Sequence, residues 1–253
     1  MAKLYYYWGA MKSSKSMNLL MAAHNYEEQG KEVLVFTSGV DDRAGHNIIK
    51  SRVGPSRKAL PVHKNTDIYQ TVITHIENGS KLYCILMDEV QFYTKQNILD
   101  ITKVVDYLGI PVLAYGLKTD FRGELFEGSQ ALLEQADKIS EIKTICVFCN
   151  NKATHNLRTN GGEPVYTGEV IQIGDEEYYP VCRKHHNDPP LTEENKIKKT
   201  PSVKSIDLKP EEEAKVRPRG SITDTVLYET KWSIASKEAH NKINEPSVLL
   251  GEK

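Results

Sequence analysis

The chain has 253 residues, 39% of them hydrophobic, and a formal net charge of -1 at pH 7. This length suits one larger domain and a small module, with enough apolar content for a buried core. A near-neutral charge gives no reason to expect a nucleic acid as partner. Because no apolar run approaches a membrane span and the N-terminus lacks a signal-peptide hydrophobic segment, we expect a cytoplasmic protein.

The first twenty residues predict a phosphate-binding loop. A strand is expected at Lys3–Trp8, and a helix follows in which Met17, Leu20, Met21 and His24 recur at helical spacing. In a loop of this kind, consecutive N–H groups and the helix dipole hold phosphate, a lysine reaches the β- and γ-phosphates, and a serine ligates Mg²⁺. The loop consists of Gly9, Ala10, Met11, Lys12, Ser13, Ser14, Lys15 and Ser16.

One position departs from the pattern Gly-x-x-x-x-Gly-Lys-Ser/Thr, since Ser14 stands where the second glycine belongs. Glycine is usual where a loop needs positive φ or a close approach to a ligand. A serine forced to positive φ would cost about 1 kcal/mol. The alternative interpretation is an ordinary serine-rich turn that caps a helix.

Alternating strands and helices predict a parallel α/β sheet with right-handed crossovers. Strands are expected at Glu32–Thr37, Leu82–Met87 and Ile110–Tyr115, and helices at Asp67–Asn78 and Thr94–Leu108. Glycine-punctuated polar loops connect them, and the charges in these loops are taken as solvated on composition alone.

The strand at Leu82–Met87 ends in two carboxylates, Asp88 and Glu89. Ligands of parallel sheets bind at the carboxyl ends of strands. Asp88 is therefore a candidate Mg²⁺ ligand, and Glu89 a candidate group for polarising a nucleophile. The alternative is a capping acid at the start of the next helix. Past the next strand, Phe121 and Phe126 are either core residues or aromatic walls for a flat base.

Two paired-ligand motifs predict a structural zinc site. Three thiolates and an imidazole make a closed tetrahedral site, with 32 residues between the two motifs. His186 is an adjacent competitor for the fourth place, although the x-x spacing favours His185. The predicted ligands are Cys146, Cys149, Cys182 and His185.

The remainder of the chain carries little functional information. Residues 188–220 are rich in Lys, Glu and Pro, which predicts a linker or disorder. One helix is conceivable at 224–243, although its apolar spacing is poor.

Taken together, the motifs resemble the zinc-containing thymidine kinases of bacteria, their phages and the eukaryotic cytoplasm. The resemblance runs from about Lys3 to His186, and so many motifs in one order are far more specific than a phosphate loop alone. They are Gly9–Ser16, Asp41-Asp-Arg43 with Ser51-Arg-Val-Gly54, Asp88-Glu-Val-Gln-Phe92, Tyr115–Phe126, and the segments Lys143–Cys146 and Val181–His186.

This resemblance implies a P-loop (RecA-like) parallel sheet with helices on both faces and a small zinc-tied lasso module. It implies transfer of the γ-phosphate of ATP to the 5′-hydroxyl of thymidine, giving dTMP for DNA synthesis by salvage. Residues 1–143 would form the ATP-binding domain, 144–187 the zinc-binding lasso domain and 188–253 a charged tail. By the same resemblance, dTTP would be a feedback inhibitor and the chain would form a homotetramer.

The resemblance also implies residue roles. Glu89 would take the proton from the thymidine 5′-hydroxyl, and Asp88 would serve the Mg²⁺ of ATP. Gln91, beside Val90, would help to order the site, and Arg43 would add positive charge near the phosphates. The thymine base would be bound by Leu117, Phe121, Phe126, Val170, Ile171, Gln172, Ile173 and Tyr178. Backbone groups of the lasso would then discriminate thymine from cytosine.

Two other classes of function stay open. One is a phosphate-loop NTPase that drives a partner, with the zinc module as its contact surface. The other is a nucleotide-binding regulator that Ser14 makes catalytically inactive. ADP release measured with and without thymidine separates these classes from a kinase.

Overall fold

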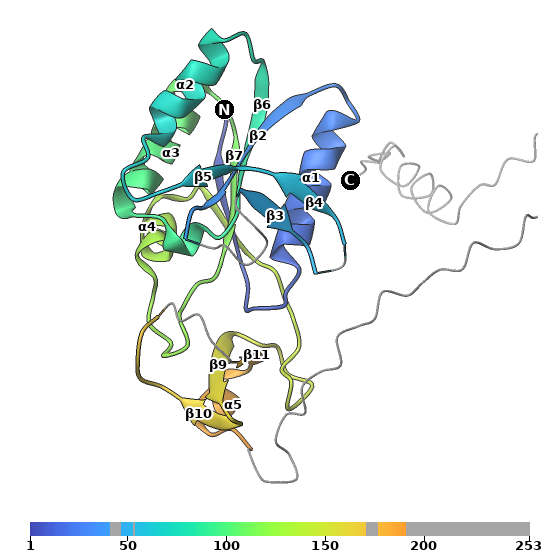
Figure 1. Cartoon of the computed structure of the whole chain (residues 1–253), viewed down its shortest axis with the longest axis vertical. Helices are drawn as coiled ribbons and strands as arrows, with labels where there is room; N and C mark the ends of the chain where they lie inside the picture. The colour runs from blue at the N-terminus through green and yellow to red at the C-terminus, as the bar shows by residue number, and fades with distance from the viewer. Residues whose placement is uncertain (41–46, 53, 171–176, 191–253) are drawn as a thin grey trace, which may run out of the picture. The chain divides into compact units, whose positions relative to one another are not determined.

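The computed structural model describes residues 1–40, 47–52, 54–170 and 177–190 (Figure 1). All of them lie within Met1–Thr200, the first of two compact units. Arg43 and its motif, Ile171–Ile173 and the tail with its conceivable helix lie outside the described residues. Within the described ranges, no helix is both long enough and apolar enough to cross a bilayer.

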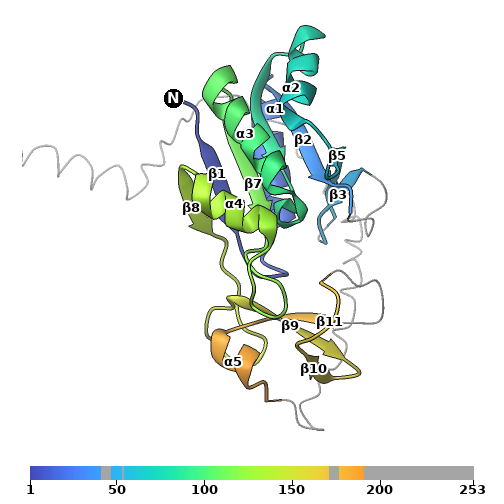
Figure 2. The same ribbon diagram turned by 90° about the vertical axis from the view of Figure 1, so that its left-hand side faces the viewer.

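In the described part of the chain, six parallel strands form the central sheet, in the order β5-β2-β6-β7-β1-β8 (Figure 2). The carboxyl ends of these strands therefore meet at one edge, and β7 separates β1 from β6. The predicted parallel α/β sheet is confirmed. The strands are β1 (Leu4–Trp8), β2 (Glu32–Ser38), β5 (Leu60–Val62), β6 (Leu82–Met87), β7 (Val112–Gly116) and β8 (Lys138–Glu141).

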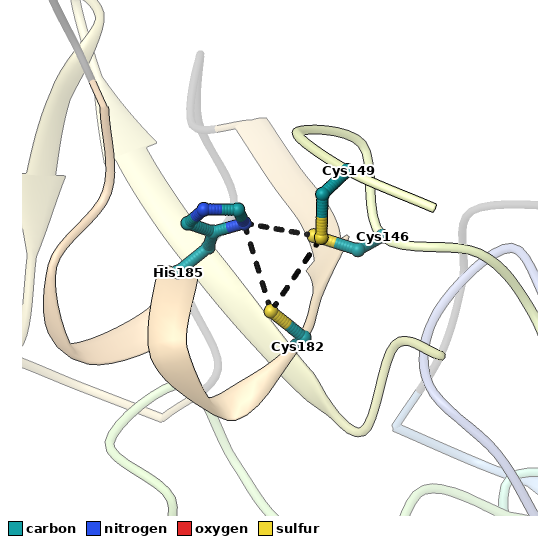
Figure 3. A group of neighbouring side chains, drawn as sticks. All are labelled: Cys146, Cys149, Cys182 and His185. Atoms are coloured by element: carbon teal, nitrogen blue, oxygen red, sulfur yellow. Dashed lines mark hydrogen bonds between the residues drawn. The ribbon is translucent and has the colours of Figure 1, made fainter. Parts of the chain in front are cut away.

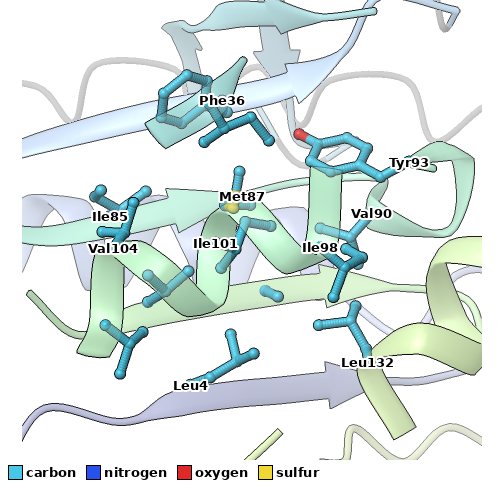
Figure 4. Packing of buried hydrophobic residues seen from close by; sticks show 14 of the residues in the cluster. Leu4, Phe36, Ile85, Met87, Val90, Tyr93, Ile98, Ile101, Val104 and Leu132 are labelled. Atoms are coloured by element: carbon cyan, nitrogen blue, oxygen red, sulfur yellow. The ribbon is translucent and has the colours of Figure 1, made fainter. Parts of the chain in front are cut away.

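Helices cover both faces of this sheet because its strands are apolar on both sides. Cys84 and Leu86 pack with α1 (Lys15–Glu27), whereas Ile85 and Met87 point to the opposite face (Figure 4). The opposite face is covered by α2 (Ile68–Glu77), α3 (Lys95–Leu108) and α4 (Glu127–Gln135). The alternation along β6 explains why its sequence is a continuous apolar run.

Helix α3 begins and ends where the sequence predicts. The Thr94 hydroxyl accepts from the Asn97 N–H (3.1 Å), and the Asn97 side chain accepts from the Thr94 N–H (3.0 Å). This reciprocal pair satisfies two backbone donors at the start of the helix. Gly109 ends the helix at φ 67, a left-handed conformation that glycine adopts without strain.

Three features differ from the expectations. Met21 on α1 is 55% exposed, whereas the expected Leu20 does lie on the core face of that helix, together with Leu19 and Ala23. The polar loop region contains a hairpin of β3 (Ile48–Lys50) and β4 (Ser56–Lys58). Neither α4 nor β8 is predicted, because α4 contains glycine and serine and β8 lies at the sheet edge.

The second part of the described chain is a small module that we call the Cys/His module. It contains a three-stranded antiparallel sheet in the order β10-β9-β11, followed by the short helix α5 (Arg183–Asn187). Its strands are β9 (His155–Asn160), β10 (Glu163–Val165) and β11 (Glu177–Val181).

The cap of α3 gives a stability test. We expect Thr94→Ala to lower the free energy of unfolding by about 1 kcal/mol, because the Asn97 N–H loses its acceptor. Thr94→Ser, which keeps the hydroxyl, should stay close to the wild type. Urea unfolding with a common m-value measures both changes. Equal destabilisation by the two variants would show that the methyl group, and not the cap, is responsible.

Candidate active site

The loop after β1 folds back toward Lys15, the first residue of α1. Lys15 is buried, and its ammonium group donates to the carbonyls of Gly9 (3.2 Å) and Ala10 (3.0 Å). A Cβ at Gly9 would lie 2.5 Å from the Ile142 carbonyl oxygen, so only glycine fits there. A loop of the predicted residues therefore lies between β1 and α1, with its lysine bonded to the loop's own carbonyls.

Ser14 has φ 65 and Lys12 has φ 62, both left-handed. Ser14 precedes α1 without any side-chain capping hydrogen bond, unlike Asp67 before α2 and Thr94 before α3. This contradicts the alternative of an ordinary serine cap. The first N–H groups and the positive dipole end of a helix that starts without a side-chain cap can bind an anion.

Asp88 lies buried at the end of β6, next to the phosphate loop. The Ser16 hydroxyl donates to its carboxylate, and Lys15 is close enough to interact electrostatically. Burial, followed by repulsion from Glu89, raises the pKa of Asp88 to about 7, although Ser16 and Lys15 act in the opposite direction. A cation nearby would stabilise the charged form of this carboxylate. The Asp88–Ser16 pair offers the oxygen ligands that Mg²⁺ prefers.

Glu89 adopts φ 51, a strained conformation for a residue other than glycine, and makes no capping hydrogen bond. The alternative of a helix-capping acid is therefore contradicted. The Gln91 amide nitrogen donates to the Glu89 carboxylate (2.6 Å), and the Gln91 oxygen accepts from the Leu117 N–H (3.0 Å). Gln91 thus fixes Glu89 against the loop after β7.

Leu117, Phe121 and Phe126 are the residues expected around the base that follow β7. Leu117 is partly buried, and its carbonyl accepts from the hydroxyls of Tyr6 (2.8 Å) and Ser129 (2.6 Å). Phe126 is partly buried with its ring edge-on to Phe92 (5.7 Å between centroids). Phe121 is only 2% exposed.

The other expected residues are placed less completely. Val170 and Tyr178 are partly buried, and Tyr178 lies on β11 in register with Arg158 of β9. Val90 is buried in the hydrophobic core behind the site, so only its backbone can face a nucleotide. Ile171, Gln172, Ile173 and Arg43 fall outside the described residues.

The four predicted metal ligands converge in the Cys/His module (Figure 3). Their ligand atoms all lie within 4.8 Å of one another. His185 belongs to this group, whereas the competing His186 forms a hydrogen bond with the Phe121 carbonyl (2.7 Å). Burial acts to raise the pKa of the Cys146 thiol, but hydrogen bonds from the Cys182 backbone and from His185 help to lower it to about 6.

The cluster dimensions fit zinc. A tetrahedral ion with bonds of about 2.3 Å to sulfur and about 2.0 Å to nitrogen needs S···S edges of about 3.8 Å and S···N edges of about 3.5 Å. The Cys149–Cys182 sulfurs are 3.9 Å apart. The His185 Nδ1 lies 3.4 Å from the Cys146 sulfur and 3.6 Å from that of Cys182. With four protein ligands, no position stays open for a substrate.

Strand β9 brings two further residues to the site that the sequence did not reveal. The Asn156 side chain accepts from the Met11 N–H in the phosphate loop (2.7 Å). Arg158, two residues on and thus on the same face of the strand, lies over the Phe121 ring at 4.5 Å. Their only sequence signal is two polar residues at alternate positions, which is common in exposed strands.

With this geometry established, the chain was compared with known proteins. A family model described as thymidine kinase matches residues 2–186. The chain belongs to the thymidine kinase family. The matched range covers the described site, from the loop after β1 to the Cys/His module.

Curated thymidine kinases of streptococci are similar to this chain. That of Streptococcus pyogenes serotype M28 (strain MGAS6180) is 54% identical over 192 residues, 76% of this chain and 100% of the relative. That of Streptococcus gordonii (strain Challis) is 53% identical over 193 residues, 76% of this chain and 99% of the relative. That of Streptococcus agalactiae serotype Ia is 51% identical over 193 residues, with 76% and 100% coverage.

The metal cluster of this family member can be tested by Cys149→Ser. A serine hydroxyl is a poor zinc ligand at neutral pH, so we expect the variant to lose metal. The α/β sheet should remain folded, because its core residues form clusters separate from that of the module. Elemental analysis for zinc and far-UV circular dichroism measure the two effects. Wild-type protein purified without chelators and free of zinc would contradict the assignment.

The raised pKa of Asp88 predicts a pH dependence of stability. The ordinary pKa of an aspartate is about 3.9, so between about pH 4 and pH 7 the folded state holds more protons than the unfolded state. The contribution of Asp88 to the free energy of unfolding therefore falls as pH rises through this window. Relative to Asp88→Asn, the wild type should lose stability from pH 5 to 7 in protein free of nucleotide and Mg²⁺.

Urea unfolding of both proteins at several pH values measures this difference. A constant difference in the free energy of unfolding across the window would show that Asp88 titrates normally.

Proposed function

We propose that this chain is a kinase that transfers the γ-phosphate of ATP to the 5′-hydroxyl of thymidine, giving dTMP. The observation that carries the proposal is the convergence of Lys15 and Ser16, at the start of α1, with Asp88 and Glu89, at the end of β6. Ser16 donates to Asp88, and Lys15 interacts with it, although these residues come from separate elements. Family membership identifies the reaction in which this arrangement operates.

The phosphate end of the reaction needs positioning and charge neutralisation. The N–H groups at the start of α1 would hold the phosphates, and Lys15 would exchange its loop carbonyls for phosphate oxygens. Asp88 and the Ser16 hydroxyl would hold Mg²⁺, which neutralises charge on the phosphoryl oxygens when bound. The raised pKa of Asp88 supports this role, because a cation relieves the cost of its burial.

The acceptor end needs a base within reach of a primary hydroxyl. Glu89 is next to the proposed Mg²⁺ ligand, and the hydrogen bond from Gln91 (2.6 Å) restricts one of its carboxylate oxygens. The carboxylate is partly buried, so it remains accessible to a substrate. We assign it the role of taking the proton from the 5′-hydroxyl.

The nucleoside base would lie near Leu117, Phe121, Phe126, Val170 and Tyr178. The Cys/His cluster would hold a structural zinc ion that stabilises the module contacting this region. Arg43, backbone groups of 171–173, feedback inhibition by dTTP and a tetrameric assembly complete the proposal by family resemblance, as does a cytoplasmic location.

The deciding experiment measures ADP release from ATP and Mg²⁺, with and without thymidine. Release that depends on thymidine, together with dTMP detected by chromatography, supports the kinase. Release without thymidine would indicate an NTPase. ATP binding without release in either condition would indicate a nucleotide-binding regulator.

Glu89→Gln tests the base. Glutamine keeps the size of the side chain but cannot accept the proton, so we expect kcat to fall by about 10²–10⁴-fold. Binding of ATP and thymidine should change little, since the lost interaction belongs mainly to the transition state. Steady-state kinetics and calorimetry measure both effects.

Ser14→Gly is the matched control for Glu89→Gln, because it also changes a residue with positive φ. It relieves backbone strain and should leave kcat unchanged or raised. Near-normal turnover by Glu89→Gln would show that the proton goes elsewhere. A wild type that is inert while only Ser14→Gly turns over would identify a regulator.

A further inference from the structure

Phe121 is held from two directions by the Cys/His module. The residue is 2% exposed, and both its ring and its carbonyl contact side chains that lie more than thirty residues further along the chain. Its own loop also restrains it, since Asp120 accepts from the N–H groups of Arg122 (2.9 Å) and Glu124 (3.0 Å). These contacts give Phe121 one defined position.

The first contact is made by Arg158. Its neighbour Leu157 packs into the core of the module with Cys146 and Cys182, so the alternation of β9 directs Arg158 away from that core. The Arg158 guanidinium is 4.5 Å from the centroid of the Phe121 ring, and the residue is only 1% exposed. A desolvated guanidinium over an aromatic face is strongly attracted to it.

The same guanidinium also binds the backbone beyond the strand. Its Nη1 donates to the Glu169 carbonyl (2.8 Å), immediately before Val170, where the proposed base-binding segment begins. Arg158 therefore joins the Phe121 ring to the start of that segment. A lysine has neither the planar face nor the forked donors needed to make both contacts together.

The second contact is made by His186. Its Nε2 lies 2.7 Å from the Phe121 carbonyl oxygen. Because a carbonyl only accepts, Nε2 must carry the hydrogen of this bond. The preceding residue on α5, His185, belongs to the metal cluster. One short helix thus directs adjacent imidazoles to the metal site and to Phe121.

We propose that Arg158 and His186 are positioning residues that fix Phe121 for the nucleoside base, so that the affinity for thymidine depends on the Cys/His module. This inference rests on the proposed function. It extends that function by assigning two residues that act through Phe121 without needing to touch the substrate.

Arg158→Met tests the first contact. Methionine keeps most of the length of the side chain but lacks the charge and the N–H donors of the guanidinium. We therefore expect the KM for thymidine to rise about tenfold to thirtyfold. The KM for ATP and kcat should stay within about twofold of the wild type. The lost contact would stabilise bound thymidine equally in the ground state and in the transition state. Arg158→Lys should show a smaller rise and serves if the methionine variant does not fold.

Arg183→Met is the matched control, because Arg183 is an exposed arginine of the same module. It should leave all constants unchanged. Equal effects of Arg158→Met and Arg183→Met would overturn the proposal, as would a rise in the KM for ATP as large as that for thymidine.

His186→Gln and His186→Leu test the second contact. Glutamine places an amide donor near the position of Nε2, whereas leucine has no donor. We expect near-normal thymidine binding for His186→Gln and a KM for thymidine about fivefold higher for His186→Leu. Both should retain zinc, because His185 is unchanged. Equal thymidine affinities of the two variants, with equal zinc contents, would refute the role of His186.

Calorimetric binding of thymidine separates this inference from the proposed function. A wild type that binds thymidine without releasing ADP would contradict the proposed function alone, and the variants' binding constants would still decide the inference. A wild type that turns over, with variants that bind thymidine normally, would contradict the inference alone.

Discussion

The side-chain amide of Gln91 is the contact on which the candidate active site depends. It donates to Glu89 after β6 and accepts from Leu117 after β7, while the Leu117 carbonyl accepts from Tyr6 of β1. The strand order β6-β7-β1 makes this possible, since the Gln91–Leu117 and Leu117–Tyr6 contacts each join neighbouring strands. A Cβ at Gly116 would lie 2.7 Å from the Gln91 oxygen, so the amide can cross β7 only because that strand ends in glycine.

Backbone strain is concentrated where the chemistry is proposed. Among the described residues, the non-glycine positions with positive φ are Lys12, Ser14, Asn47 and Glu89. All except Asn47 lie in the phosphate loop or at the end of β6. Each left-handed residue costs about 1 kcal/mol, and such costs persist where the surrounding structure over-determines the conformation. Ordinary local preferences are therefore broken at the site, where α1 starts without a side-chain cap and Gln91 holds the Glu89 carboxylate.

The sequence predicted those parts of the fold that local patterns determine. The run Leu82–Met87, the capped helix after Thr94 and the spacing of the four metal ligands each carry their own signal, and each is found where expected. The prediction failed where tertiary contacts override local pattern. The spacing placed Met21 on the same face of α1 as Leu20, but Leu20 is buried against the sheet with Leu19 and Ala23 and Met21 is exposed. Gly128 of α4 approaches the Val90 carbonyl so closely that no larger residue fits. Because glycine is unfavourable inside helices, the sequence pattern does not predict α4.

The roles of Asn156 and Arg158 could not be read from the sequence, because they depend on how β9 lies against loops far away in the chain. A polar residue at alternate strand positions usually faces water. In β9 the polar face is buried as well. One face of the strand packs on the module core, and the other packs on the phosphate loop and Phe121. Only the three-dimensional arrangement distinguishes these cases.

The small core of the Cys/His module explains why a metal would matter for the contacts that Asn156, Arg158 and His186 make outside the module. Its buried cluster consists of Cys146, Leu157, Tyr179, Val181 and Cys182, and two of the three cysteine ligands are among them. A core of this size buries too little apolar surface to order a module by itself. Metal binding would supply the missing free energy, because a preformed site does not exist in the unfolded chain. A zinc ion at this cluster would therefore influence both substrates through β9 and α5, although it is held entirely by protein ligands.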